Sequence, residues 1–129
     1  SAHLVDLVLE QTTDFDAQST GRCYCDFAAM KPYCTNQLPG ILAEWDRLLD
    51  TKAFMTGETV TVADLKIYET LRKLRLIEKQ PEIGTAALAA FPRLSAFLDR
   101  VEALPAMQAY LTSDRYMERP LNNVHAQFK

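Results

Sequence analysis

Apolar residues recur along the chain with the spacing of helices rather than strands. Between residues 38 and 49 they lie three, four and seven positions apart, on one face of a helix that is expected to bury Trp45. The same pattern runs from residue 94 to 104 behind Pro92, and Pro105 is expected to end that helix and open another. This last helix is expected to carry three side chains inward, those of Met107, Tyr110 and Leu111. The chain shows no alternating strand of useful length and no internal repeat.

Two further segments have a less regular pattern. From Leu4 to about Gln18 the chain is apolar first and polar later, so we expect a helix whose second half faces something other than a dry core. The segment from Gln80 to Ala86 contains a proline and a glycine, which predict an excursion over the surface between two helices.

The sharpest local signal is the pair Thr61 and Asp64. The Thr61 hydroxyl can accept a hydrogen bond from the Asp64 N–H, and the Asp64 carboxylate can accept one from the Thr61 N–H. Val60 and Leu65 have the spacing of a hydrophobic staple around this capping box. We therefore predict a helix that begins after Thr61 and runs to about Ile77.

Composition supports helices and excludes several classes of function. Leu and Ala together make 33 residues, whereas Val and Ile make only 10, which favours helix over sheet. The 129 residues suit one domain, over 1–129. A net charge of -3 without a basic cluster argues against nucleic acid as a partner. No apolar run approaches the roughly 18 residues of a membrane span, so no membrane is expected either. No metal motif or phosphate-binding glycine loop is present, and no metal is predicted.

The cysteines point to a reducing compartment. Cys23, Cys25 and Cys34 are an odd number, whereas a secreted disulfide framework prefers an even and denser set. We expect reduced thiols that are partly buried as small hydrophobes, and a cytoplasmic location.

Several segments, taken in order, resemble the glutathione transferases. Residues 54–65 read FMTGETVTVADL and resemble the capping box and staple that open the central buried helix of that family. Residues 90–94 read AFPRL and are similar to the next helix of the mu and sigma classes. Residues 109–116 and 126–128 resemble the mu-class tail, and residues 23–32 are similar to the mu-class loop between the first two helices of the domain.

The resemblance implies an all-α fold, the C-terminal helical bundle of five to six helices of a glutathione transferase. In the family this domain forms a wall of the electrophile pocket and part of the dimer interface. A separate N-terminal thioredoxin-like domain holds glutathione and supplies the hydroxyl that stabilises its thiolate. The chain lacks the βαβ pattern of that domain. It is therefore expected to be half of an enzyme, to carry no catalytic residue, to bind no cofactor alone and to be inactive by itself, with glutathione the co-substrate of the parent protein.

The resemblance also implies a binding site for a small hydrophobic electrophile. Tyr24 matches the mu-class pocket tyrosine, whose protonated hydroxyl can donate to charge that develops on the electrophile. The alternative is a tyrosine with its ring in the core and its hydroxyl at the surface. Thr13, Ala17 and Gly21 are small and leave room on the pocket side of the first helix. Asn122 stands where mu enzymes close the pocket with an apolar residue.

A carboxylate is implied at a second place. Asp14 matches the mu-class aspartate that reaches across a homodimer towards the glutathione amine, and a carboxylate pairs well with an ammonium. Asp16 lies two residues on, and a solvated acidic face of the helix is the ordinary alternative for both.

Two other functions stay open. Helical domains of this type also serve as non-catalytic interaction modules in translation factors and synthetase-associated proteins, and one fold can host several functions. A carrier of apolar ligands could use the same pocket. Tyr24, Asp14 and the mu-like tail favour the enzyme, because an assembly module has no need for them.

Overall fold

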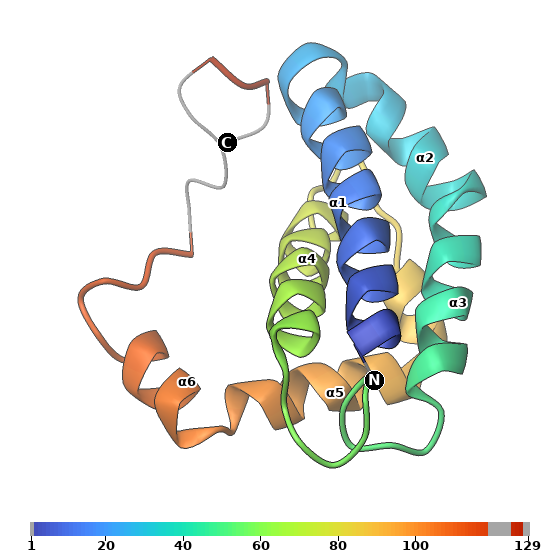
Figure 1. The fold of residues 1–129 in the computed structure, drawn as a ribbon. Coiled ribbons are helices and arrows are strands. Elements are labelled where there is room, and N and C mark those ends of the chain that lie inside the picture. Colours follow the sequence, from blue (N-terminus) through green and yellow to red (C-terminus); the bar gives the residue numbers. More distant parts are fainter. Residues whose placement is uncertain (1, 119–124, 128–129) are drawn as a thin grey trace.

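The computed structural model describes residues 2–118 and 125–127, and six α-helices form in these residues (Figure 1). They are α1 (Ala2–Cys25), α2 (Met30–Asn36), α3 (Leu38–Leu49), α4 (Val62–Glu78), α5 (Pro92–Glu102) and α6 (Pro105–Leu111). Two short 3-10 helices join them, η1 (Phe27–Ala29) and η2 (Ala87–Ala90). Within the described residues, β pairing is limited to one bridge between Phe54 and Gly57. The prediction of an all-α bundle with five to six helices is confirmed.

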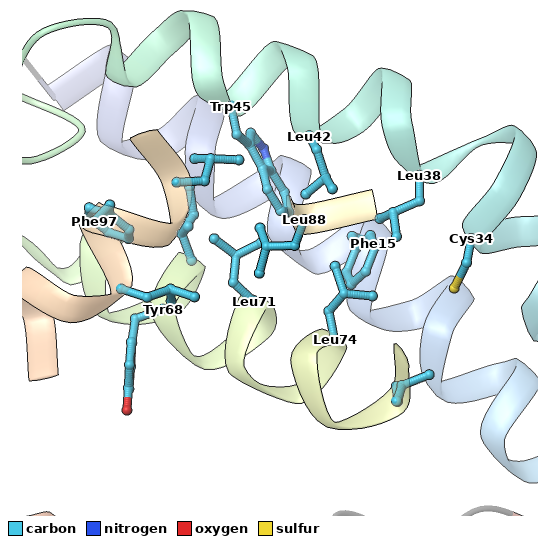
Figure 2. Packing of buried hydrophobic residues seen from close by; sticks show 14 of the residues in the cluster. Phe15, Cys34, Leu38, Leu42, Trp45, Tyr68, Leu71, Leu74, Leu88 and Phe97 are labelled. Atoms are coloured by element: carbon cyan, nitrogen blue, oxygen red, sulfur yellow. The ribbon is translucent and has the colours of Figure 1, made fainter. Parts of the chain in front are cut away.

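Helix α4 lies at the centre and packs against α1 and α5. Figure 1 shows α1 and α4 side by side, with α5 crossing at the end where α1 begins. The core fills the space between α4, α1 and α3: Leu71 and Leu74 of α4 face the side of α3 that carries Trp45 (Figure 2). Trp45 is fully buried, as predicted, and its ring meets that of Phe15 edge-on with centroids 5.7 Å apart.

The capping box forms at the start of α4. The Asp64 carboxylate accepts from the Thr61 N–H at 2.7 Å and from the Thr61 hydroxyl at 3.1 Å. Its other oxygen accepts from the Met55 N–H at 2.7 Å, a bond that the sequence pattern did not predict. The carboxylate is fully buried, so it joins the helix start to the loop before it.

The expectations for the first helices need correction. Helix α1 continues seven residues beyond Gln18 to Cys25, so Tyr24 lies in its last turn and not in a loop. Nothing in residues 19–25 breaks a helix, since Gly21 costs only about 1 kcal/mol and burial of Cys23 favours continuation. Helix α2 also takes the place of an expected loop, because Pro32 falls in a first helical turn that tolerates it.

Two other expectations were wrong in part. Helix α6 buries no residue fully: Tyr110 is 40% exposed, and only Met107 packs against the core. The reason is that α6 packs against α5 alone and has no second layer to cover it. The segment from Gln80 to Ala86 turns at the surface as predicted, with Gly84 at φ 57°, but it also inserts Ile83 into the core.

The thiols fit the prediction in most respects. Cys23 and Cys34 are buried, Cys25 is exposed, and all three are free. Burial raises the pKa of Cys34 to about 11, with the nearby Glu78 carboxylate as a smaller cause, so this thiol stays protonated at neutral pH.

Candidate functional site

The residues predicted for the binding site lie along α1. Thr13, Ala17 and Tyr24 share one face of the helix, because positions four and eleven apart nearly coincide around its axis. With a rise of about 1.5 Å per residue, Thr13 and Tyr24 are roughly 16 Å apart along the helix. Thr13, Ala17 and Gly21 are exposed, as expected for a face with room beside it. Asn122 lies outside the described residues.

Tyr24 is half-buried at the end of this face. Its ring packs against the hydrophobic core, which agrees with the structural alternative for the ring. A half-buried ring in a helix still leaves its outer part beside the exposed positions of the preceding turns. The geometry therefore supports both roles at once, a ring that anchors the last turn and a group at the edge of the open face.

Asp14 lies on the neighbouring side of α1, in a groove between α1 and α3. The groove has a volume of about 330 Å³ and is lined by Gln11, Asp14, Phe15, Gln18, Gln37, Gly40, Ile41, Glu44 and Trp45. The Trp45 indole N–H donates to the Gln11 carboxamide at 3.1 Å in its wall. Two carboxylates and three carboxamides line the groove without a cationic side chain, so it favours a positively charged group.

Asp16 has a different surrounding. Its carboxylate pairs with Lys66 at 2.9 Å and accepts from the Thr70 hydroxyl at 3.1 Å, both on α4. The Asp16 carboxylate also raises the pKa of Lys66 through this bond. Asp16 therefore joins two helices, whereas the exposed Asp14 carboxylate has no hydrogen bond or ion pair with the described residues.

A second groove lies between α4 and α6. It has a volume of about 250 Å³ and is lined by Leu65, Tyr68, Glu69, Arg72, Met107, Tyr110, Leu111 and Tyr116. Leu65 and Tyr110 are 44% and 40% exposed, which is high for large apolar side chains. The Arg72 guanidinium lies over the Tyr116 ring, 5.7 Å from its centroid, and fixes the segment after α6 at the edge of the groove. The sequence pattern missed this surface because it predicted that α6 faces inward.

Comparison with known proteins bears on both surfaces. The family model of the glutathione S-transferase C-terminal domain matches residues 13–114. The chain belongs to this family. Both the capping box and the α1 face lie within or beside the matched range, so the glutathione transferase domain and the candidate site are one unit.

Relatives with printed names are mu-class glutathione transferases. Human glutathione S-transferase Mu 3 is 34% identical over 125 residues, which are 96% of this chain and 53% of that protein. The class-mu 26 kDa isozyme 1 of Fasciola hepatica is 34% identical over 102 residues, 79% of this chain and 43% of that protein. The chain thus spans about half the length of the curated relatives that it matches.

A solved structure shares the fold of the glutathione transferase domain. The Pi-class glutathione S-transferase of Onchocerca volvulus superposes with a TM-score of 0.81 over 97% of this chain and 60% of that one, at 24% sequence identity. In residues 2–118 and 125–127, none of the helices combines the length and hydropathy that crossing a bilayer requires. The same residues contain no group of three His, Cys, Asp or Glu side chains placed to hold a metal ion.

Proposed function

We propose that this domain forms one wall of the electrophile pocket of a glutathione transferase, which joins glutathione to small hydrophobic electrophiles. The observation that supports this most is the similarity to a mu-class enzyme over 96% of the chain. In the reaction the glutathione thiolate attacks an electrophilic carbon, the C–S bond forms, and the leaving group departs with its electron pair. The activation of the thiol belongs to a thioredoxin-like domain, so the domain alone is inactive.

Tyr24 acts on the electrophile in this proposal. Negative charge develops on the electrophile as the thiolate adds, and a protonated phenol at the end of the α1 face can donate a hydrogen bond to it. Thr13 and Ala17 leave the space along α1 in which the rest of the substrate lies. The half-buried ring of Tyr24 supports the role, because a ring packed on the core directs its hydroxyl with little freedom.

The thioredoxin-like domain docks on the groove between α4 and α6. The groove presents Leu65, Met107 and Tyr110, and exposed apolar surface of this kind marks an interaction site. About half of each curated relative lies outside the match, which is enough chain for a domain of that size. The parent protein is a cytoplasmic homodimer, and Asp14 in the α1–α3 groove reaches the glutathione amine bound to the partner subunit.

Substitution of Tyr24 tests the role in the pocket. The protein to use is this domain joined behind the thioredoxin-like half of the human Mu 3 relative, called here the joined protein. Tyr24→Phe removes one hydroxyl, and loss of one donor to developing charge lowers kcat about tenfold to a hundredfold. Tyr33→Phe is the matched control, because the buried Tyr33 hydroxyl has no hydrogen-bond partner among the described residues. Equal kcat for both variants and the parent would contradict the proposal for Tyr24.

Substitution of Asp14 tests the role across the dimer. Asp14→Asn keeps the size of the side chain and removes the charge, so the KM for glutathione in the joined protein rises about three- to tenfold while kcat stays the same. Glu10→Gln, one turn earlier on α1 and also exposed, is the control for a general loss of negative charge. A KM that rises equally in both variants would show a general field effect and not a contact with glutathione.

A further inference from the structure

The end of α1 is completed by a residue about a hundred positions away. The last carbonyl groups of a helix have no partner inside it and need one from elsewhere. The Gln127 carboxamide donates to the Cys25 carbonyl at 3.1 Å and accepts from the Phe27 N–H at 2.8 Å. One side chain thus satisfies a helix carbonyl and the first amide of η1, on the two sides of Asp26.

The neighbouring residue fixes this contact in place. Ala126 is 4% exposed, although it lies in a segment without regular structure. Figure 1 shows the C-terminal end of the chain at the end of the bundle where α1 meets η1 and α2, away from α6. A carboxamide carries both a donor and an acceptor, which a carboxylate does not, so the pair of bonds is specific to this type of side chain.

We propose that Gln127 is a positioning residue for Tyr24. Tyr24 precedes Cys25 directly and lies in the turn whose last carbonyl Gln127 satisfies. Helix ends fray when their terminal groups lack partners, and a frayed last turn would leave the Tyr24 ring without a fixed direction. The C-terminal segment therefore sets where the Tyr24 hydroxyl points. The consequence for catalysis rests on the proposed function, but the positioning itself does not.

The first measurement reads the clasp directly, by amide hydrogen exchange of Phe27 in the 129-residue chain. Gln127→Ala removes the acceptor, and loss of one hydrogen bond speeds exchange of the Phe27 amide about five- to tenfold. Gln127→Glu keeps an acceptor and loses the donor, so Phe27 stays within about twofold of the parent. Gln80→Ala is the control, since it removes a carboxamide bond to the Leu76 carbonyl at the end of α4. Unchanged Phe27 exchange in Gln127→Ala would overturn the proposal.

The second measurement reads the position of Tyr24 without a substrate. With 3-fluorotyrosine at position 24, the fluorine NMR signal is expected as one sharp line in the parent and in Gln80→Ala. In Gln127→Ala it shifts or broadens, because the ring samples more than one direction. An unchanged signal, even with faster Phe27 exchange, would show that the clasp exists but does not position Tyr24, and would overturn the proposal. Neither readout depends on conjugation activity, so failure of the proposed role of Tyr24 in catalysis remains a separate result.

Discussion

At the scale of single residues, one buried carboxylate holds the start of the central helix in place. Asp64 is fully buried and accepts three hydrogen bonds, two from Thr61 and one from the Met55 N–H. Its removal takes away the helix cap and also leaves the N–H of the buried Met55 without a partner.

We expect Asp64→Ala to lower the free energy of unfolding by about 2–4 kcal/mol, the sum of a lost cap and an unsatisfied buried donor. Urea unfolding followed by the fluorescence of Trp45 measures this value. Asp99→Ala removes an exposed carboxylate from α5 and is expected to change it by less than about 0.5 kcal/mol. Equal stability of the two variants would contradict the role of the carboxylate.

Two buried tyrosines differ in the partners of their hydroxyl groups. The Tyr68 hydroxyl donates to Glu102 at 3.2 Å and joins α4 to α5, whereas the Tyr33 hydroxyl has no partner among the described residues. Tyr68→Phe is therefore expected to destabilise the domain by about 1 kcal/mol, and Tyr33→Phe to leave it unchanged or slightly more stable. Calorimetric melting of both variants decides this, and the reverse order of stability would refute the assignment.

The same tyrosines predict a loss of stability in alkali. Burial raises the pKa of Tyr33 to about 12, and burial together with the Glu102 carboxylate raises that of Tyr68 to about 12. The unfolded chain releases these protons near pH 10, whereas the folded chain retains them. Stability from this source is complete below pH 10 and is lost between pH 10 and 12. The double variant Tyr33→Phe, Tyr68→Phe is expected to show a smaller fall between pH 9.5 and 11 in urea unfolding, and an equal fall would contradict the cause given.

At the scale of elements, the turn before α4 depends on a glycine. Gly57 has φ 141° and closes the bridge to Phe54, with hydrogen bonds of 2.8 and 3.1 Å between their backbones. A side chain added there meets no atom within 4 Å, so any cost comes from the backbone conformation and not from a clash.

We expect Gly57→Ala to destabilise the domain by about 1–2 kcal/mol, because L-residues rarely adopt that φ. Gly21→Ala is the matched comparison. Gly21 lies inside α1, also with open space around its Cα, and alanine there is expected to stabilise the helix by about 0.5–1 kcal/mol. The two variants therefore change the urea midpoint in opposite directions, and a shift of the same sign would contradict the explanation.

Elements with strong apolar periodicity could be predicted from the sequence, and the others could not. Helix α3 begins and ends where the pattern did, and α4 begins directly after Thr61, because a local signal set each boundary. The end of α1 and the whole of α2 depend on burial of Cys23, Met30 and Tyr33 against other helices, which no local pattern records. Helix α6 has the apolar spacing of a packed helix but lacks a layer to pack on.

At the scale of the whole molecule, the domain presents surfaces that a partner would complete. The α4–α6 groove is apolar, and the α1–α3 groove is acidic. The sequence placed Tyr24, Thr13 and Ala17 on one face of α1, because helical spacing alone decides that. It could not show the contact of Gln127 with the end of α1, since the two lie a hundred positions apart in the chain.

Docking of the thioredoxin-like domain is expected to depend on Leu65. Leu65→Glu places a charge in the α4–α6 groove, and burying it against the other domain is costly, so the joined protein should lose its single cooperative melting transition. Ala86→Glu adds the same charge at an exposed position beyond the other end of α4 and is expected to leave the transition intact. Two separate transitions in both variants, or in neither, would argue against docking at this groove.

The most direct test of the account is the conjugation of glutathione to 1-chloro-2,4-dinitrobenzene, followed by the absorbance of the product. We predict no enzymatic rate for the purified 129-residue chain, and a rate for the joined protein that falls when Tyr24 is changed to Phe. Measurable turnover by the chain alone would contradict the division of labour between the two domains. A folded joined protein without turnover would contradict the enzymatic function and favour a non-catalytic interaction module.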